Sequence, residues 1–186
     1  SFHHIICDAW SIWLIVGDIC KAYANNGVLT LANDENDQQS FQRAVDSQNQ
    51  LETSERGDKL RAYWLNVLGG ELPQLNFPTD TIVQNTEQPK GASLHFALST
   101  DLTAKITAFC SAEGITLYCL LLSAWQLFLH RYTGQDDILV GSPVAGRDES
   151  GTTNAVGYFV NQIVLRTNLA GNPTVKALLY QVRKTV

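Results

Sequence analysis

The side chains best suited to proton chemistry lie together near the start of the chain, in the run His3-His4-Ile5-Ile6-Cys7-Asp8. An imidazole titrates near neutral pH, so it can move or stabilise a proton during a reaction. Because adjacent residues of extended backbone point to opposite sides, we expect only one of the two histidines to face a given cavity. Asp8 precedes an apolar helical pattern, where its carboxylate can pin the turn through a buried charge-assisted hydrogen bond or orient the imidazole.

Two simpler interpretations of this cluster stay open from the residues alone. The spacing of His4 and Asp8 is common by chance, so the pair could be a surface histidine and a helix-start aspartate. A metal site would need three or four converging ligands, and the other two histidines, His95 and His130, show no recognisable ligand spacing. We therefore expect no metal at this cluster.

The hydrophobic periodicity predicts a layered α/β architecture around the cluster. Helices are expected over 11–24, 55–68, 99–112, 116–132 and from 174 onward, and strands over 93–98, 138–141 and 158–166. The segment 32–58 is the most polar of the chain and is expected to be solvated, with room for one helix. An extended loop is expected over 72–89.

Composition and charge exclude several classes of protein. With 45% hydrophobic and 17% charged residues, the chain is typical of a globular protein. Its net charge of −5 and the absence of a basic run argue against a nucleic-acid partner. The longest apolar stretch, Leu117 to Leu129, is too short to span a membrane and is expected to be a buried core helix.

The cysteines indicate the cellular compartment of the protein, and the chain ends indicate a larger parent protein. The four cysteines lie in apolar stretches without CxxC spacing, so we expect reduced, buried thiols in a cytoplasmic protein: Cys7, Cys20, Cys110 and Cys119. The sequence contains no methionine and stops within a helical pattern. We interpret it as an internal piece of a larger protein.

The motifs of the chain, taken in order, resemble the condensation domains of non-ribosomal peptide synthetases. The chain opens on the pattern HHxxxDxWS, formed by His3, His4, Asp8, Trp10 and Ser11. Further blocks follow in the family's order and with family-like spacing: residues 60–64, 75–80, 127–137, 140–147 and 156–166. One departure is Ala9, which stands where the family usually has glycine.

The resemblance implies a fold and a division of the chain. The fold is α/β and chloramphenicol acetyltransferase-like, comprising the end of the N-terminal lobe and most of the C-terminal lobe of a two-lobed condensation domain. The active-site motif and its helix would occupy residues 1–30, a polar connecting region 31–90 and the C-terminal lobe 91–186. Residues 1–186 would thus be a partial domain, truncated at both ends, and we expect the chain alone to be inactive.

The resemblance also implies an activity, namely amide bond formation between a donor acyl or aminoacyl thioester and an aminoacyl acceptor. Both substrates would be carried on the phosphopantetheine of carrier proteins, with no cofactor bound directly. The partners would be upstream and downstream peptidyl or acyl carrier proteins and the adenylation domain of the same module, with no nucleic acid and no membrane. Two alternatives stay open: a related HxxxD acyltransferase that uses free or CoA substrates, and a non-catalytic condensation-like domain that recruits a partner protein.

By motif position, the resemblance assigns three residues to the catalytic group. His4 would be the catalytic histidine, acting as a general base or positioning the amine and stabilising charge. His3 would support it, and Asp8 would be the structural carboxylate, in a salt bridge with Arg147.

Four further residues are expected to belong to the motif or to the tunnel. Trp10 and Ser11 follow the motif aspartate, and Trp10 is expected to pack rather than react. Asn161 is expected either to be a satisfied core amide or to line a channel, since strand alternation places it among apolar neighbours. Arg166 lies on the opposite face and is expected to form a structural ion pair.

Overall fold

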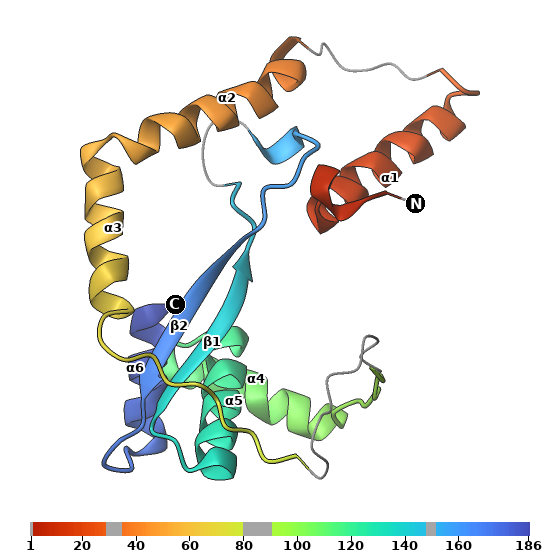
Figure 1. The fold of residues 1–186 in the computed structure, drawn as a ribbon. Coiled ribbons are helices and arrows are strands. Elements are labelled where there is room, and N and C mark those ends of the chain that lie inside the picture. The colour runs from red at the N-terminus through yellow and green to blue at the C-terminus, as the bar shows by residue number, and fades with distance from the viewer. Residues whose placement is uncertain (1, 29–34, 80–90, 148–151) are drawn as a thin grey trace. The chain divides into compact units, whose positions relative to one another are not determined.

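The computed structural model describes residues 2–28, 35–79, 91–147 and 152–186, which form helices and a two-stranded sheet (Figure 1). The chain divides into two compact units. The first unit comprises Ser1–Gly70 and Gly141–Ile163, and the second comprises Glu71–Val140 and Val164–Val186.

The first unit holds the histidine run and the helices that follow it. A 3-10 turn, η1 (His4–Ile6), leads into α1 (Ala9–Ala24), and a second short turn, η2, spans Thr152–Asn154. The expected helix over 11–24 is confirmed but begins earlier, at Ala9, because Asp8 is its N-cap. The Asp8 carboxylate accepts a hydrogen bond from the backbone N–H of Ser11 at 2.8 Å, which satisfies one of the free donors of the first turn.

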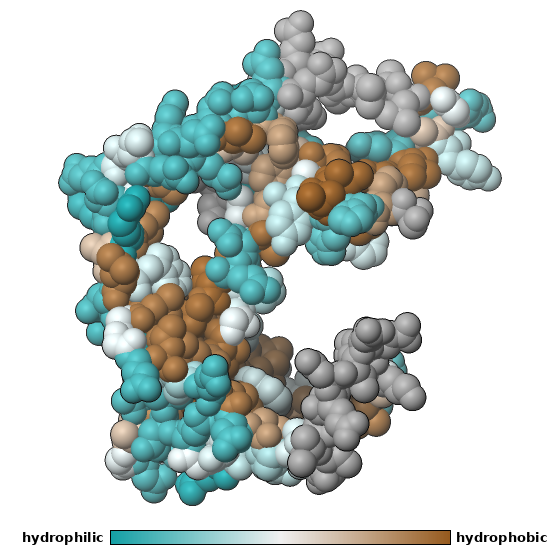
Figure 2. All heavy atoms as spheres, viewed as in Figure 1, coloured by the Kyte–Doolittle hydropathy of each residue, from teal (hydrophilic) through white to brown (hydrophobic). Residues whose placement is uncertain are grey.

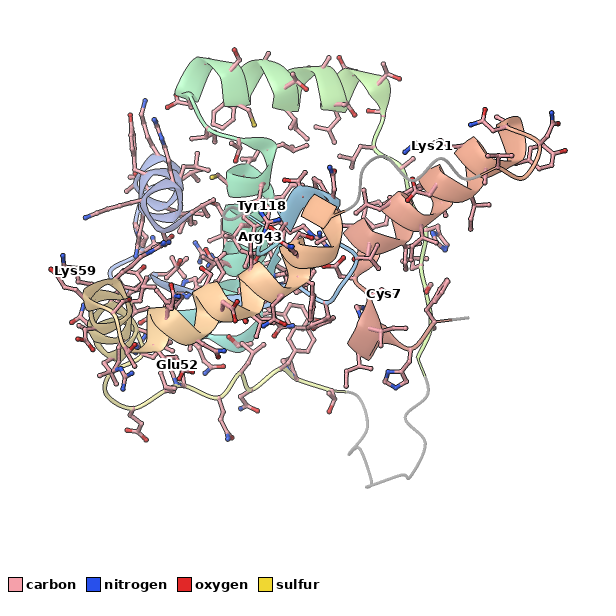
Figure 3. The ribbon with its side chains drawn as sticks, turned by 90° about the horizontal axis from the view of Figure 1, so that it is seen from above. Cys7, Lys21, Arg43, Glu52, Lys59 and Tyr118 are labelled. Carbon is pink, nitrogen blue, oxygen red and sulfur yellow. The ribbon has the colours of Figure 1, made fainter. Side chains whose placement is uncertain are left out.

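The expected polar segment contains the long helix α2 (Glu35–Glu52), which is followed closely by α3 (Glu55–Val67). Figure 3 shows α2 from the side and α3 nearly end-on, so the two helices meet at an angle next to Glu52. Ser54 makes this corner: its hydroxyl donates to the Leu51 carbonyl at 2.8 Å and accepts from the Gly57 N–H at 3.0 Å. A Cβ atom at Gly57 would overlap the Leu51 carbonyl oxygen, so the corner requires glycine.

The second unit contains α4 (Thr100–Glu113), α5 (Leu117–Thr133) and α6 (Val175–Thr185), close to the expected helices. Ser99, Thr116 and Thr174 are their N-caps, each accepting a hydrogen bond from a first-turn N–H. The core of this unit consists of buried apolar side chains from all three helices, the strands and the segment that follows them: Cys110, Cys119, Leu122, Leu129, Ile138, Leu165, Leu169, Leu178, Leu179 and Val182.

The helices of the second unit also bear on membrane insertion. None of the helices in the described ranges is by itself long and apolar enough to cross a membrane. Only α4 and α5 together reach that length and hydropathy, and they are bent by 103° at the break between them.

The two strands, β1 (Asp137–Val144) and β2 (Asn161–Asn168), form an antiparallel pair. The Leu169 N–H donates to the Asp136 carbonyl at 2.8 Å, which places the end of β2 beside the start of β1. The strand expected over 158–166 begins later, at Asn161, because the backbone of Gly157 and Phe159 bonds to α1 residues instead of to a strand.

Within the second unit, the Gln135 side chain holds the extended segment around Gln74 and Asn76. The Gln135 amide accepts from the Asn76 N–H at 2.8 Å and donates to the Gln74 carbonyl at 2.9 Å, as a neighbouring strand would. The Phe77 ring stacks on Tyr132 with ring centroids 5.1 Å apart. The expected loop over 72–89 is observed as far as Thr79, and its remainder lies outside the described residues.

Two expectations are wrong. Residues 93–98 form no strand, because no neighbouring strand in the described part of the chain supplies the hydrogen bonds that would define one. Leu94 and Phe96 are more than 80% exposed there. Cys20 is exposed, whereas the other three cysteines are buried, because it lies on a face of α1 that packs against nothing in the described residues.

The tight corner between α2 and α3 generates a stability prediction. We expect Gly57→Ala to lower the free energy of unfolding by about 1–3 kcal/mol, because the added methyl overlaps the Leu51 carbonyl. Gly17→Ala in α1 is the matched control: nothing lies within 4 Å of its added Cβ, so helix propensity should raise stability by about 0.5–1 kcal/mol. Thermal melting of both variants is the measurement, and equal effects would contradict the observed corner.

Candidate active site

The two histidines occupy different kinds of backbone. His3 is extended, with φ −76° and ψ 134°, whereas His4 opens the η1 turn. The expected alternation of two extended histidines is therefore wrong, because the chain turns between them. The His3 ring accepts the Ile5 N–H on Nδ1 at 3.2 Å, so a neutral His3 carries its proton on Nε2. His3 thus caps the turn, and His4 projects from it with its imidazole exposed to solvent.

The Asp8 side chain is fully buried at the start of α1. Its carboxylate accepts the N–H of Ser11 at 2.8 Å and the N–H of Phe159 at 3.1 Å. Arg147 Nη2 lies 3.0 Å from Oδ1 and 3.2 Å from Oδ2 of the same carboxylate. Among the described residues these three supply all of its hydrogen bonds, so Asp8 holds the turn and accepts no hydrogen bond from either imidazole.

Arg147 is the centre of the buried network that surrounds Asp8. Its Nη2 also donates to the Ser11 hydroxyl at 2.9 Å, and its Nη1 donates to the carbonyls of Thr152 and Ala155, both at 2.7 Å. The guanidinium lies over the Phe159 ring, 4.3 Å from its centroid, which adds a cation–π contact. One buried cation thereby ties α1 to the chain on both sides of η2.

Ser11 completes this network through its hydroxyl. The Ser11 Oγ donates to the Gly157 carbonyl at 2.7 Å and accepts the Gly157 N–H at 3.0 Å. The Asp8 N–H donates to the same carbonyl at 3.2 Å. The sequence placed Ser11 in the motif but did not indicate this role. It also did not indicate the roles of Gly157 and Phe159, which lie in the block 156–166, or of Thr152, which lies in none of the blocks.

Two close approaches of the backbone require glycine beside this network. Gly146 has φ +64°, in the left-handed region, and a Cβ there would overlap the Phe159 carbonyl oxygen. At Gly157 a Cβ would lie 2.8 Å from the Phe159 ring and 2.9 Å from the Phe41 ring. These glycines let Phe159, whose ring lies against the Arg147 guanidinium, pack closely against the backbone at 146 and 157.

The ionisation of Asp8 is set by this environment. Burial by itself would raise the pKa of the carboxyl, because a desolvated charge is costly. Hydrogen bonds from the backbone N–H groups of Ser11 and Phe159, and from the side chain of Arg147, stabilise the ionised form and outweigh burial. The pKa of Asp8 is lowered from 3.8 to about 2, so the pair with Arg147 is ionic at neutral pH.

The remaining motif residues lie around the network or away from it. Trp10 is 46% exposed, and its Nε1–H donates to the Thr153 carbonyl at 2.9 Å. Asn161 is exposed at the start of β2, where its side-chain oxygen accepts the Gln162 N–H at 2.8 Å. It is therefore not a core amide, and the sequence-based placement of this residue among buried neighbours fails because β2 is exposed at this end.

Arg166 and the other histidines lie in the second unit. Arg166 Nη2 lies 2.7 Å from the Asp137 carboxylate, in an ion pair across the two strands. His130 lies 2.9 Å from the Gln135 carbonyl, and His95 is exposed. No group of three or more His, Cys, Asp or Glu side chains within the described ranges could hold a metal ion.

Fold and site together define a class of protein. An exposed imidazole lies on a turn that a buried aspartate–arginine pair closes, and the α/β fold is the chloramphenicol acetyltransferase-like fold of condensation domains. The family model described as the condensation domain matches residues 1–186. The chain belongs to the condensation domain family, and the fold class expected from the sequence is confirmed.

Curated relatives include gramicidin and bacitracin synthases. The chain is 39% identical over 190 residues to one of the linear gramicidin synthase proteins of Brevibacillus parabrevis, a match that covers 100% of this chain and 4% of that protein. It is 31% identical over 185 residues to bacitracin synthase 3 of Bacillus licheniformis, covering 100% of this chain and 3% of that one. The chain therefore spans a few per cent of the length of these relatives.

Solved structures share the fold. SgcC5 of Streptomyces globisporus superposes with a TM-score of 0.74 at 26% identity, covering 98% of this chain and 41% of that protein. The first condensation domain of the calcium-dependent antibiotic synthetase gives a TM-score of 0.73 at 21% identity, covering 98% of this chain and 40% of that one. The chain thus corresponds to about two fifths of these structures.

The buried ion pair generates a stability prediction. We expect Asp8→Ala to lower the free energy of unfolding by about 3–5 kcal/mol, because the change leaves the Arg147 charge buried and unpaired. Asp101→Ala is the matched control, because its pair with Lys105 has a similar length, 2.8 Å, but is more than 70% exposed. That variant should lose at most about 1 kcal/mol. Chemical denaturation measures both, and an equal loss would contradict the buried network.

The lowered pKa of Asp8 generates a prediction about pH. A carboxyl whose pKa is lower in the folded state contributes stability above its unfolded pKa and loses that contribution as the pH falls through its folded pKa. The stability advantage of the wild type over Asp8→Asn should therefore be constant above about pH 4 and shrink between pH 4 and pH 2. Denaturation at a series of pH values measures it, and an advantage that does not change would argue against an ionised Asp8.

Proposed function

We propose that this chain forms part of a domain that catalyses amide bond formation between carrier-bound substrates in non-ribosomal peptide or hybrid polyketide–peptide synthesis. The donor is an acyl or aminoacyl thioester, and the acceptor is an aminoacyl thioester with a free amine. The observation that carries the proposal is the exposed imidazole of His4 on the η1 turn, which precedes the buried Asp8–Arg147 pair. The whole length of the chain matches the condensation domain model.

In the proposed reaction, the acceptor amine nitrogen attacks the thioester carbonyl carbon of the donor. A carbon–nitrogen bond forms, the carbon–sulfur bond breaks, and the amine proton finally resides on the departing thiol of the donor carrier. His4 either accepts this proton or positions the amine and stabilises the developing charge, and both roles need the reachable imidazole that η1 presents. His3 supports the turn, and Asp8 holds it in place through Arg147.

The proposed partners follow from the substrates. Phosphopantetheine arms of upstream and downstream carrier proteins would bring the thioesters, and an adenylation domain of the same module would load the acceptor. Linear gramicidin and bacitracin synthases, to which the chain is similar, support this setting. We also propose a cytoplasmic location, since all four cysteines are free thiols.

The proposed organisation of the chain retains the three regions expected from its motifs. Residues 1–30 would carry the active-site motif, 31–90 would connect the lobes and 91–186 would belong to the C-terminal lobe of one condensation domain. Trp10 and Ser11 would belong to the motif, Asn161 would face the tunnel from the exposed start of β2, and Arg166 would keep the strand pair in register.

A substitution of His4 tests the proposed reaction. In the complete synthetase that carries this segment, we expect His4→Ala to lower the rate of peptide formation between loaded carrier proteins by about 10²–10⁴-fold, because a positioned proton-transfer group is lost. His95→Ala is the matched control, since its imidazole is also exposed but lies outside the motif. Single-turnover transfer, followed by mass spectrometry of both carriers, is the measurement.

The outcomes separate the proposal from its alternatives. Undiminished product with His4→Ala would contradict the catalytic role of this residue. Transfer to a free amine or from a CoA thioester at the carrier-dependent rate would instead favour an acyltransferase that uses free substrates. Absence of product from the wild type, together with capture of a partner protein, would favour a recruitment domain.

A further inference from the structure

The ring of Tyr158 lies against the imidazole of His4. The two ring centroids are 5.4 Å apart and the ring planes are inclined by 74°, which is an edge-to-face arrangement. Within the described residues, Tyr158 is the one aromatic ring that contacts His4. Tyr158 is 51% exposed, so the contact lies at the surface of the first unit, where a substrate can reach the imidazole.

The backbone on both sides of Tyr158 is locked by the buried network. Gly157 exchanges two hydrogen bonds with the Ser11 hydroxyl, at 2.7 and 3.0 Å, and its carbonyl also accepts the Asp8 N–H. Phe159 donates its N–H to the Asp8 carboxylate at 3.1 Å, and its ring lies under the Arg147 guanidinium. Tyr158 is therefore a half-exposed side chain whose two neighbours in the chain are both bonded to the buried network.

The position of Tyr158 explains how the buried Asp8–Arg147 pair can influence the exposed imidazole of His4, to which it makes no hydrogen bond. The hydrogen bonds of Asp8 come from Ser11, Phe159 and Arg147, and none comes from His4. The path from the ion pair to the imidazole runs instead through the held backbone at 157–159 and then through the ring of Tyr158. An edge-to-face contact favours one rotamer over others that lack it.

We propose that Tyr158 is the positioning residue of His4: its ring, fixed by the Asp8–Arg147 network, selects the imidazole rotamer that serves the reaction. The inference rests on the proposed catalytic role of His4 and deepens it. Because the ring acts by contact and not by proton transfer, the phenol hydroxyl is dispensable. Tyr158→Phe therefore preserves the function, and Tyr158→Leu removes it.

The test combines kinetics with a spectroscopic signature of His4. In the complete synthetase, Tyr158→Leu is expected to lower kcat for carrier-to-carrier transfer by about 2- to 10-fold, with KM for the loaded carriers unchanged. In histidine-labelled protein, the Cε1–H resonance of His4, identified by its absence from His4→Gln, is expected to shift in Tyr158→Leu because the ring current of the tyrosine is lost. Tyr158→Phe is expected to restore both kcat and the resonance position.

Controls exclude a general loss of structure. Tyr180→Leu is the matched variant, since Tyr180 is 55% exposed and lies on α6, outside the first unit. It should change neither the resonance nor kcat. The melting temperatures of Tyr158→Leu and Tyr180→Leu should be the same. If Tyr158→Leu melts at a lower temperature than wild type, Tyr158→Ile is used in its place.

Each outcome decides the proposal. Unchanged kcat and an unchanged His4 resonance in Tyr158→Leu overturn it, even where His4→Ala is inactive, so the proposed function can stand without it. An equal loss in Tyr158→Phe and Tyr158→Leu also overturns it, because the hydroxyl would then act directly. A shifted resonance in Tyr158→Leu, together with full activity of His4→Ala, would uphold the contact while the catalytic role of His4 fails.

Discussion

The first unit depends on how the buried charge of Arg147 is compensated. Only 8% of this residue is exposed. Removing a cation from water costs several kcal/mol unless an anion and acceptors replace the solvent. Here Asp8, the Ser11 hydroxyl and the carbonyls of Thr152 and Ala155 do so. The buried hydrophobic cluster beside it is small, namely Ala44, Ala155 and Phe159. Polar compensation, more than apolar burial, therefore positions the start of α1.

The network separates stability from reactivity in the histidine motif. Asp8 is buried, ionised and bonded to α1, Phe159 and Arg147, so it cannot move with the substrate. His4 lies on the preceding turn with its ring exposed. Figure 2 shows hydrophobic and hydrophilic residues side by side on one face of the molecule. A reactive group needs access to the substrate, whereas a charged structural group needs shielding from water. The turn between His4 and Asp8 allows one short segment to meet both needs.

Much of the fold and part of the site could be predicted from the sequence. The helices followed from apolar periodicity, because this signal involves residues close in sequence. The approach of Arg147 to Asp8 followed only from a family resemblance, because no local pattern reports a contact between residues so far apart. The prediction of a strand over 93–98 was wrong for the same reason: alternation indicates a possible strand, but a partner strand decides whether one forms.

By itself, the sequence determined the helices, the proton-chemistry cluster and the order of motifs, since neighbouring residues encode helical periodicity, caps and turns. Tertiary structure alone decided that Ser11 bonds to Gly157 and that Phe159 lies under Arg147. It also decided that β2 begins after these contacts and that Tyr158 meets His4. The physical reason is that a buried charge takes its partners from whatever backbone the fold brings within hydrogen-bond distance, and that choice depends on the whole chain.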